Sequence, residues 1–206
     1  MMASYKLTYF DFDGGRAEPL RIAFHAAGIA FEDRRISFPE FSEMRGKFRF
    51  NAVPVLEIDG TVVTQSNAMN RYIGKFAGLY PADDLQALYC DEVMDALADL
   101  LHYIVQTFFL EGDELKEARQ KLVDGRLSVF LKGLDELLER GGGEYFAANT
   151  LTMADLKTFV QVRSLCAGNL DHVPTDIVQR LAPGLLEHKE RVERDPRVVA
   201  YYAARS

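Results

Sequence analysis

Tyr9 is the first residue whose type and position are compatible with chemistry. It comes near the end of residues 5–10, an aromatic and β-prone segment that a turn-rich loop follows at residues 11–15. Binding and catalytic groups in α/β units gather at the carboxyl ends of strands, where loops reach a ligand. Aromatic residues in strands also commonly belong to the core, and Tyr5 and Phe10 share that explanation. Position alone therefore leaves both roles open for Tyr9.

Pro54 and the pair Gln65-Ser66 form a second candidate group. Pro54 opens a β-rich segment after a basic loop, where a cis peptide bond would expose the backbone of Val53 to an extended ligand. Ser66 is placed as the N-cap of a helix over residues 67–76, and the free N–H groups of a helix N-terminus suit a carboxylate. Taken singly, Ser66 is explained more simply as an ordinary N-cap. Together with Tyr9, these residues fit a short peptide with a carboxylate at each end and a reactive centre near the tyrosine.

Two aspartates and two cysteines complete the chemically interesting side chains. Asp95 and Asp99 are four residues apart and so lie on one face of a predicted helix, where solvated surface charge is the simpler explanation. Cys90 and Cys166 have neither CxxC nor zinc-ligand spacing. We therefore expect no disulfide framework and no zinc site, and interpret both cysteines as small buried side chains.

The first 80 residues must position Tyr9, Pro54 and Ser66, and their pattern alternates between strand and helix. Strands are predicted at residues 5–10 and 31–37, with a helix over 16–27 that Gly28 closes, which is a βαβ unit with parallel strands. Residues 38–51 are interpreted as irregular. Strands at 54–58 and 61–64 flank Asp59-Gly60, a strong hairpin signal, and the helix over 67–76 follows.

The remaining sequence predicts helices alone. After a turn-rich linker at residues 78–84, amphipathic segments cover 84–111 and 114–140, and three glycines follow at 141–143. Thr152 and Asp155 have the spacing of a helix capping box. Shorter helices are predicted near 175–181 and 184–194, with Pro196 as the stop. The expected fold is α/β plus all-α, with domains at 1–80 and 81–206.

Composition excludes several classes of protein. The 206 residues carry a formal net charge of −7, which argues against a protein that binds nucleic acid. At 48% hydrophobic and 27% charged residues the chain can bury a core, so disorder is not expected. An apolar segment long enough to span a membrane and a signal peptide are both missing from the pattern, so we expect a cytoplasmic protein without a membrane partner. The acid excess falls entirely in residues 81–206, with 22 acidic against 14 basic side chains, which supports two domains.

The order and spacing of several short motifs resemble the cytosolic glutathione transferases, and among them most closely the sigma class, which includes glutathione-dependent prostaglandin D isomerases. The resemblance extends over nearly the whole chain. It rests on Lys6 to Phe10, Gly15 to Glu18, Val53 to Leu56, Asp59-Gly60, Gln65-Ser66 and Leu151 to Asp155. It implies a thioredoxin-like first domain (βαβ-ββα) that binds glutathione, an all-helical second domain, a homodimer, and glutathione as co-substrate with no permanently bound cofactor.

The resemblance also implies individual roles. Tyr9 is the hydroxyl that hydrogen-bonds the glutathione sulfur, Arg16 lies near that sulfur, and Gln65 and Ser66 hold the γ-glutamyl end. Val53 pairs through its backbone with the cysteinyl residue, before a Pro54 that is cis in the family. At the glycyl end, Phe41 stands where the family has tryptophan and Arg45 where it has lysine. Ala52 stands where the family has lysine or glutamine, so one contact with the glycyl carboxylate is lost, and Arg49 or Arg45 is expected to compensate for it.

Expectations for the helical domain are fewer. Asp99 is expected to cross the dimer interface to the γ-glutamyl amino group of glutathione bound by the other subunit. Ala98 replaces the middle one of three aspartates that attract a divalent metal in some sigma members, so we predict no functional metal. The electrophile site is expected to be lined by Phe10, Phe12, Leu101 and Tyr103.

Three hypotheses for the function follow from these residues. Thioredoxin-like and cysteine-dependent activities need a cysteine at the first loop, and the sequence has none there. Conjugation of glutathione to hydrophobic electrophiles is the main prediction, and glutathione-dependent prostaglandin isomerisation is the alternative within enzymes. A non-catalytic binding protein or lens crystallin of the same fold is the alternative outside them, disfavoured by the joint presence of Tyr9, Arg16, Gln65 and Ser66, and by the lack of the long insertion expected of the crystallins.

Overall fold

The first half of the molecule is built around a four-stranded mixed sheet. The computed structural model describes residues 3–205. Strands β1 (Tyr5–Phe10), β2 (Glu32–Ile36), β3 (Val55–Ile58) and β4 (Thr61–Val63) lie in the order β2-β1-β3-β4. β1 is parallel to β2, as a βαβ unit requires, and antiparallel to β3. Asp59 and Gly60 both have positive φ and join β3 to β4 in the predicted hairpin.

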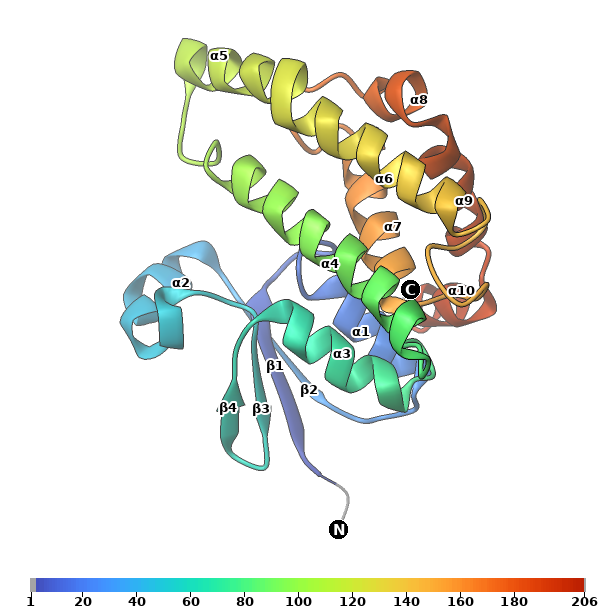
Figure 1. The fold of residues 1–206 in the computed structure, drawn as a ribbon. Helices are drawn as coiled ribbons and strands as arrows, with labels where there is room; N and C mark the ends of the chain where they lie inside the picture. The colour runs from blue at the N-terminus through green and yellow to red at the C-terminus, as the bar shows by residue number, and fades with distance from the viewer. Residues whose placement is uncertain (1–2, 206) are drawn as a thin grey trace.

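Helices α1 (Glu18–Ala26) and α3 (Ser66–Phe76) pack against each other between the sheet and the helical half (Figure 1). Helix α3 begins one residue earlier than predicted. Gln65, at φ 72°, is the residue before the helix, and Ser66 is its first helical residue. The prediction that Ser66 is the N-cap was therefore wrong by one position.

Residues 38–51 are helical where the sequence analysis expected irregular structure. Helix α2 (Phe38–Met44) begins after Ser37, whose side chain accepts a hydrogen bond from the backbone of Glu40 and caps the helix. Two short 3₁₀ turns, Arg45–Lys47 and Arg49–Asn51, follow. None of these three elements contains a buried residue, so they lack the apolar periodicity by which a helix is recognised in a sequence.

In the second half, the described residues form helices and no strand. They are α4 (Asp84–Val105), α5 (Gly112–Leu122), a π-helical turn (Val123–Leu127), α6 (Ser128–Arg140), α7 (Met153–Cys166), α8 (Ile177–Leu181), α9 (Pro183–Glu193) and α10 (Pro196–Ala203). Pro196 begins α10 instead of stopping the last helix, because Asp195 caps the new helix and a proline is favourable in its first turn. Among the described helices, none combines the length and the apolar character needed to cross a membrane.

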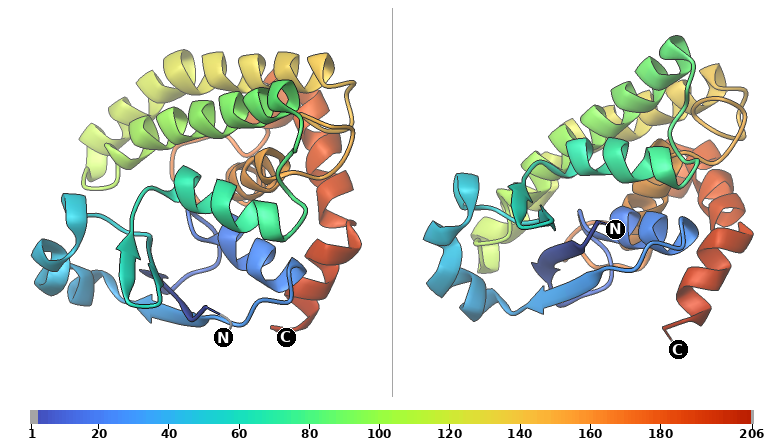
Figure 2. Two further views of the ribbon diagram at one scale, coloured as in Figure 1. Left: turned by 60° about the horizontal axis from the view of Figure 1, so that its bottom comes forward. Right: turned by 90° about the horizontal axis from the view of Figure 1, so that it is seen from below.

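Helix α7 is the centre of the molecule and joins its two halves. It contacts α1 and α3 on one side and α4, α8 and α9 on others, and its residues 153–162 are all buried (Figure 2). The predicted capping box holds its start, since Asp155 accepts hydrogen bonds from the backbone and side chain of Thr152. The site described below therefore rests against a rigid, well-packed helix. Cys90 is buried in this core, as expected, and Cys166 is partly exposed.

Candidate functional site

Tyr9 lies at the carboxyl end of β1, with 5% of its surface exposed. Its hydroxyl oxygen accepts a hydrogen bond from the backbone N–H of Arg16 at 3.2 Å. Burial raises the pKa of Tyr9, so the hydroxyl keeps its proton at neutral pH. A hydroxyl that accepts one bond and keeps its proton can donate that proton to an anionic atom beside it.

The loop before α1 is shaped around this hydroxyl. Gly15 has φ +62°, and a Cβ at this position would lie 2.6 Å from the Tyr9 oxygen, so the tyrosine ring needs a glycine there. Arg21, itself buried, donates to the carbonyl of Phe12 at 3.1 Å. Arg35 and Arg205 both pair with Asp13, which fixes the far side of the same loop.

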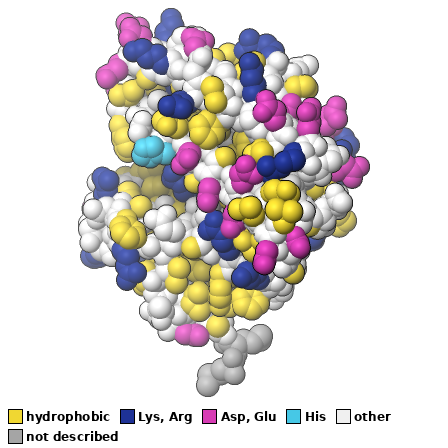
Figure 3. Space-filling view, viewed as in Figure 1, with side chains coloured by type: hydrophobic (Ala, Val, Ile, Leu, Met, Phe, Trp, Pro, Cys, Tyr) yellow, Lys and Arg dark blue, Asp and Glu magenta, His cyan; other side chains and the backbone are white. Residues whose placement is uncertain are grey.

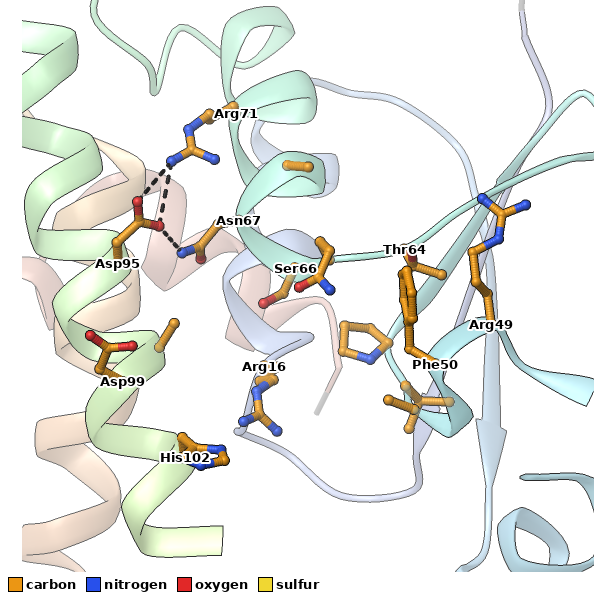
Figure 4. A pocket seen from close by; sticks show the side chains of 16 residues that line it. Arg16, Arg49, Phe50, Thr64, Ser66, Asn67, Arg71, Asp95, Asp99 and His102 are labelled. Atoms are coloured by element: carbon orange, nitrogen blue, oxygen red, sulfur yellow. Dashed lines mark hydrogen bonds and ion pairs between the residues drawn. The ribbon is translucent and has the colours of Figure 1, made fainter. Parts of the chain in front are cut away.

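A first cavity of about 600 Å³ opens where the sheet half meets α4 (Figure 4). In Figure 3 a hollow is visible on this face between the two halves, with basic, acidic and histidine side chains at its border. Six residues predicted for the site lie together in the lining, namely Arg16, Val53, Pro54, Gln65, Ser66 and Asp99. The other lining residues are Arg49, Phe50, Ala52, Thr64, Asn67, Ala68, Arg71, Asp95, Ala98 and His102.

One wall of the first cavity is formed by backbone groups. The N-terminus of α3 begins there at Ser66, so free N–H groups and the positive end of the helix dipole face a ligand. The Val53-Pro54 peptide bond, which lines the same wall, is cis, as the resemblance implied.

Charged side chains lie around the rest of the first cavity (Figure 4). Asp95 is held by Arg71 at 3.4 Å and by the side chain of Asn67 at 2.5 Å. Arg16, Arg49 and Asp99 form no salt bridge with any residue between 3 and 205, so their charges are available to a ligand. The arrangement suits a molecule with separated anionic and cationic groups.

A second cavity of about 500 Å³ lies on the other side of Arg16. It is lined by Tyr9 and Arg16, by the predicted Phe12 and Leu101, and by further apolar residues of α4, α7 and the loops that follow them, such as Ile104, Val105, Phe108, Val160 and Leu170. Arg16 lines both cavities, and Tyr9, whose hydroxyl accepts the hydrogen bond from the Arg16 backbone, lines the second. The second cavity combines this apolar surface with the charged side chains of Asp13, Glu18 and Arg163.

Four predicted site residues lie elsewhere. Phe10 packs against Phe38 and Phe41, with ring centroids 4.5 and 5.2 Å apart, and so belongs to the α2 contact. Tyr103 faces away from the second cavity, toward Phe130 and the guanidinium of Arg126. Neither of these two residues lines the second cavity.

Phe41 and Arg45 are likewise outside the first cavity. The Phe41 ring stacks on Phe48, and Arg45 donates to the carbonyl of Asn51 at 3.3 Å. Arg49 and Phe50, on the second 3₁₀ turn, line the cavity in their place. His102 was missed, although its spacing of three residues from Asp99 puts it on the same face of α4.

Comparison with known proteins agrees with this architecture. Residues 5–75 match the family model of the glutathione S-transferase N-terminal domain, and residues 98–205 match that of the C-terminal domain. The chain therefore belongs to the glutathione S-transferase family, and the expected thioredoxin-like sheet domain followed by an all-helical domain is confirmed.

Three relatives show the range of proteins that are similar to this chain. Glutathione S-transferase 3 of Caenorhabditis elegans is 32% identical, over 99% of this chain and 98% of the relative. S-crystallin 4 of Enteroctopus dofleini is 29% identical, over 100% of this chain and 98% of the relative. The structure of prostaglandin synthase D of Nilaparvata lugens superposes with a TM-score of 0.85 at 26% identity, over 98% of each chain.

The crystallin alignment corrects one argument from the sequence. It extends over 219 positions for the 206 residues of this chain, which leaves room only for short insertions in that crystallin. Chain length therefore does not separate this protein from the crystallins, and the argument from a long insertion was wrong.

Proposed function

We propose that this protein conjugates the glutathione thiolate to hydrophobic electrophiles. The observation that carries the proposal is the placement of the buried, protonated Tyr9 hydroxyl beside Arg16, which lines both the charged first cavity and a second cavity that offers apolar surface. A reaction between a zwitterionic peptide thiol and an apolar electrophile needs such a meeting point. Residues 1–80 serve as the glutathione-binding domain, and residues 81–206 contribute most of the electrophile site.

The first cavity accommodates glutathione in one orientation. The γ-glutamyl carboxylate binds at the N-terminus of α3, with Gln65 and Ser66, and the cysteinyl backbone pairs with Val53 before Pro54. The sulfur then lies beside Arg16 and Tyr9. Arg49, which lines this cavity, receives the glycyl carboxylate instead of Arg45, and Phe41 has no direct contact with the ligand.

Tyr9 makes the sulfur reactive by stabilising its anion. A free thiol has a pKa of about 8.5, so ionisation at neutral pH needs a fall of about two units, or roughly 2.7 kcal/mol. One charge-assisted hydrogen bond contributes about 1.5–3 kcal/mol, and the charge of Arg16 adds to it. The thiol proton leaves to solvent, the sulfur electron pair forms the new C–S bond, and the leaving group departs with its own electron pair.

The second cavity holds the electrophile. Leu101, Ile104, Val105, Phe108 and Val160 provide apolar surface next to the sulfur position, and Phe12 closes one side. Glutathione-dependent isomerisation of a prostaglandin endoperoxide is the second candidate, and the likeness to the prostaglandin synthase D structure favours it. Both reactions use the same thiolate.

We also propose a cytoplasmic homodimer. Phe50 lines the first cavity, and 70% of its surface is exposed, which is unfavourable for a large apolar side chain in water. Its backbone is in the left-handed conformation, which costs further free energy. A second subunit packed on this edge would cover Phe50. Asp99, which lines the first cavity, would bind across this interface the γ-glutamyl amino group of glutathione held by the other subunit.

Turnover assays test the proposal directly. The protein should bind to immobilised S-hexylglutathione and should convert 1-chloro-2,4-dinitrobenzene in the presence of glutathione. Turnover of a prostaglandin endoperoxide, with glutathione unchanged, would favour the isomerase. Retention on the column without activity toward either substrate would contradict both enzymatic functions and favour a binding protein.

A further inference from the structure

Lys157 is a buried cation that the proposed reaction does not use. It belongs to α7, in the helical half, and only 7% of its surface is exposed. Its ammonium group donates to the carbonyl oxygen of Met94 at 2.9 Å, and it also donates to the side-chain oxygen of Asn67. Met94 is on α4 and Asn67 is on α3, so one amine connects three helices and both halves of the molecule.

The contact with Asn67 fixes the orientation of a side chain in the first cavity. Asn67 directly follows Ser66 and lines that cavity. An ammonium group can only donate, so the amide oxygen of Asn67 must face Lys157. Its NH₂ group then donates to the carbonyl oxygen of Met94 at 3.0 Å, which also accepts from Lys157, and to Asp95 at 2.5 Å. Lys157 thereby holds the first turn of α3, where the γ-glutamyl carboxylate is proposed to bind.

The two oxygen partners of Lys157 are neutral, and Lys157 forms no salt bridge within residues 3–205. Burial lowers the pKa of Lys157 to about 7, so its charge is incomplete near neutral pH. Asp95 on α4 favours the charged form, whereas Arg16 before α1 and Arg71 on α3 oppose it.

The other titratable groups around Lys157 do not neutralise it. Cys90 on α4 is a buried thiol whose pKa is raised to about 11, so it carries no charge at neutral pH. On α9, His188 is bonded at 2.9 Å to Asp155 of α7, which is two residues from Lys157 and so lies on another face of the helix. An anion arriving at the N-terminus of α3 would therefore be the additional negative charge that favours the ammonium form.

We propose that Lys157 is a positioning residue for the γ-glutamyl end of glutathione: its ammonium group locks Asn67, and binding of the ligand's carboxylate drives protonation of Lys157. The inference rests on the proposed glutathione site, and it adds that Lys157 takes up a proton when the γ-glutamyl end binds, so a glutathione derivative without a free thiol binds more weakly as the pH rises above neutral. The sign follows from linkage, because the ligand binds better to the protonated form. Lys157 touches no reacting atom, so its effect should appear in binding and not in the chemical step.

Isothermal titration with S-hexylglutathione tests the proposal, because this probe has no thiol to titrate. Measured at about pH 7.5 in phosphate and in Tris, whose ionisation enthalpies differ, the binding enthalpy should reveal uptake of roughly half a proton. Lys157→Met should abolish the uptake and weaken binding about 10-fold, the effect of losing one charge-assisted contact. Lys157→Arg keeps a permanent charge, so it should bind within about 2-fold of wild type without proton uptake.

Two control variants separate Lys157 from other titratable side chains. Lys189→Met removes a lysine on α9 that is 19% exposed and pairs with Glu193, and it should leave both the affinity and the proton uptake unchanged. His102→Gln removes the titratable imidazole of the first cavity, and the uptake should persist. Uptake that disappears in His102→Gln or persists in Lys157→Met would overturn the proposal.

The remaining outcomes are also decisive. If wild type binds S-hexylglutathione without proton uptake, the role of Lys157 is wrong although the glutathione site stands. If wild type does not bind the probe at all, the proposed function itself is contradicted. Should Lys157→Met fail to fold, Lys157→Arg still decides, because proton uptake equal to wild type in that variant would exclude Lys157 as its source.

Discussion

The two cavities that meet at Arg16 are built in different ways. The first combines charged side chains with backbone features, which are a helix N-terminus, a cis peptide bond and residues such as Phe50 and Gln65 with positive φ. The second is lined by side chains of α4 and α7, by the loop at residues 12–16 and by the loops that follow α4 and α7. A ligand with fixed charges is recognised by fixed backbone groups, whereas an apolar ligand is recognised by shape. The second cavity can therefore change by substitution without disturbing the first.

Tyr9→Phe should produce the largest effect, because Tyr9 lies beside Arg16, which lines both cavities. Loss of the hydrogen bond to the thiolate should lower kcat about 50-fold at neutral pH, while the Kd for glutathione stays within about 2-fold. The deficit should shrink toward about pH 9, since a free thiol ionises there unaided. Steady-state kinetics with 1-chloro-2,4-dinitrobenzene across this range measures both effects.

A matched control for this variant is Tyr5→Phe, on the same strand, where the ring of Tyr5 packs against Phe24. Its kcat should equal that of wild type. Full activity of Tyr9→Phe at neutral pH would show that the tyrosine does not activate the sulfur.

Gly15→Ala should have the next largest effect, because a methyl group there pushes directly on the Tyr9 hydroxyl. We expect kcat to fall about 10-fold and the free energy of unfolding to fall by about 1–2 kcal/mol, from the contact and the left-handed backbone together. Gly46→Ala, which would meet no atom within 4 Å, is the control and should change neither quantity. Thermal unfolding and kinetics of both variants decide whether the hydroxyl needs this spacing.

Arg49→Gln probes the first cavity alone. It should raise KM for glutathione about 5-fold with little change in kcat, because it removes a contact made equally in the ground state and the transition state. Arg45→Gln, whose side chain bonds to Asn51 outside the cavity, should raise KM less than about 2-fold. The opposite ranking would restore Arg45 as the residue that receives the glycyl carboxylate.

Leu101→Ala probes the second cavity and should have the smallest effect. Loss of apolar surface should raise KM for the electrophile about 3-fold, a typical value for a partly exposed contact. The Kd for S-hexylglutathione is unsuitable here because its alkyl chain enters the same cavity, so S-methylglutathione measures the first cavity separately and should bind unchanged. A parallel loss of S-methylglutathione binding would mean that the two cavities are not independent.

Local sequence signals predicted the parts of the fold that depend on neighbouring residues. Asp59-Gly60 formed its hairpin and Thr152 with Asp155 formed its capping box, because both depend on a few adjacent residues. Residues 38–51 and the helix after Pro196 were missed. The first has no buried face to produce a periodic pattern, and the second begins at a proline, which can start a helix as well as stop one.

Leu101 and Tyr103 show where the site could not be predicted. Both are apolar residues of one helix, two positions apart, and each residue turns a helix by about 100°, so they face nearly opposite sides. Which side meets the second cavity depends on how α4 is rotated against α7, and packing sets that rotation. The structure places Leu101 in the cavity and Tyr103 against Phe130.

The sequence by itself determined the four strands and their order along the chain, the two-part architecture and the group Tyr9, Arg16, Gln65 and Ser66, since these follow from local patterns and a family resemblance. Lys157 marks what only the tertiary structure decided. In the sequence it is one charged residue within an apolar helical segment, which suggests an exposed side chain. Because α1, α3, α4 and α9 enclose α7, the amine is buried instead and faces the first cavity through Asn67. Burial in the assembled fold, and not residue type, gives this lysine a pKa near neutrality.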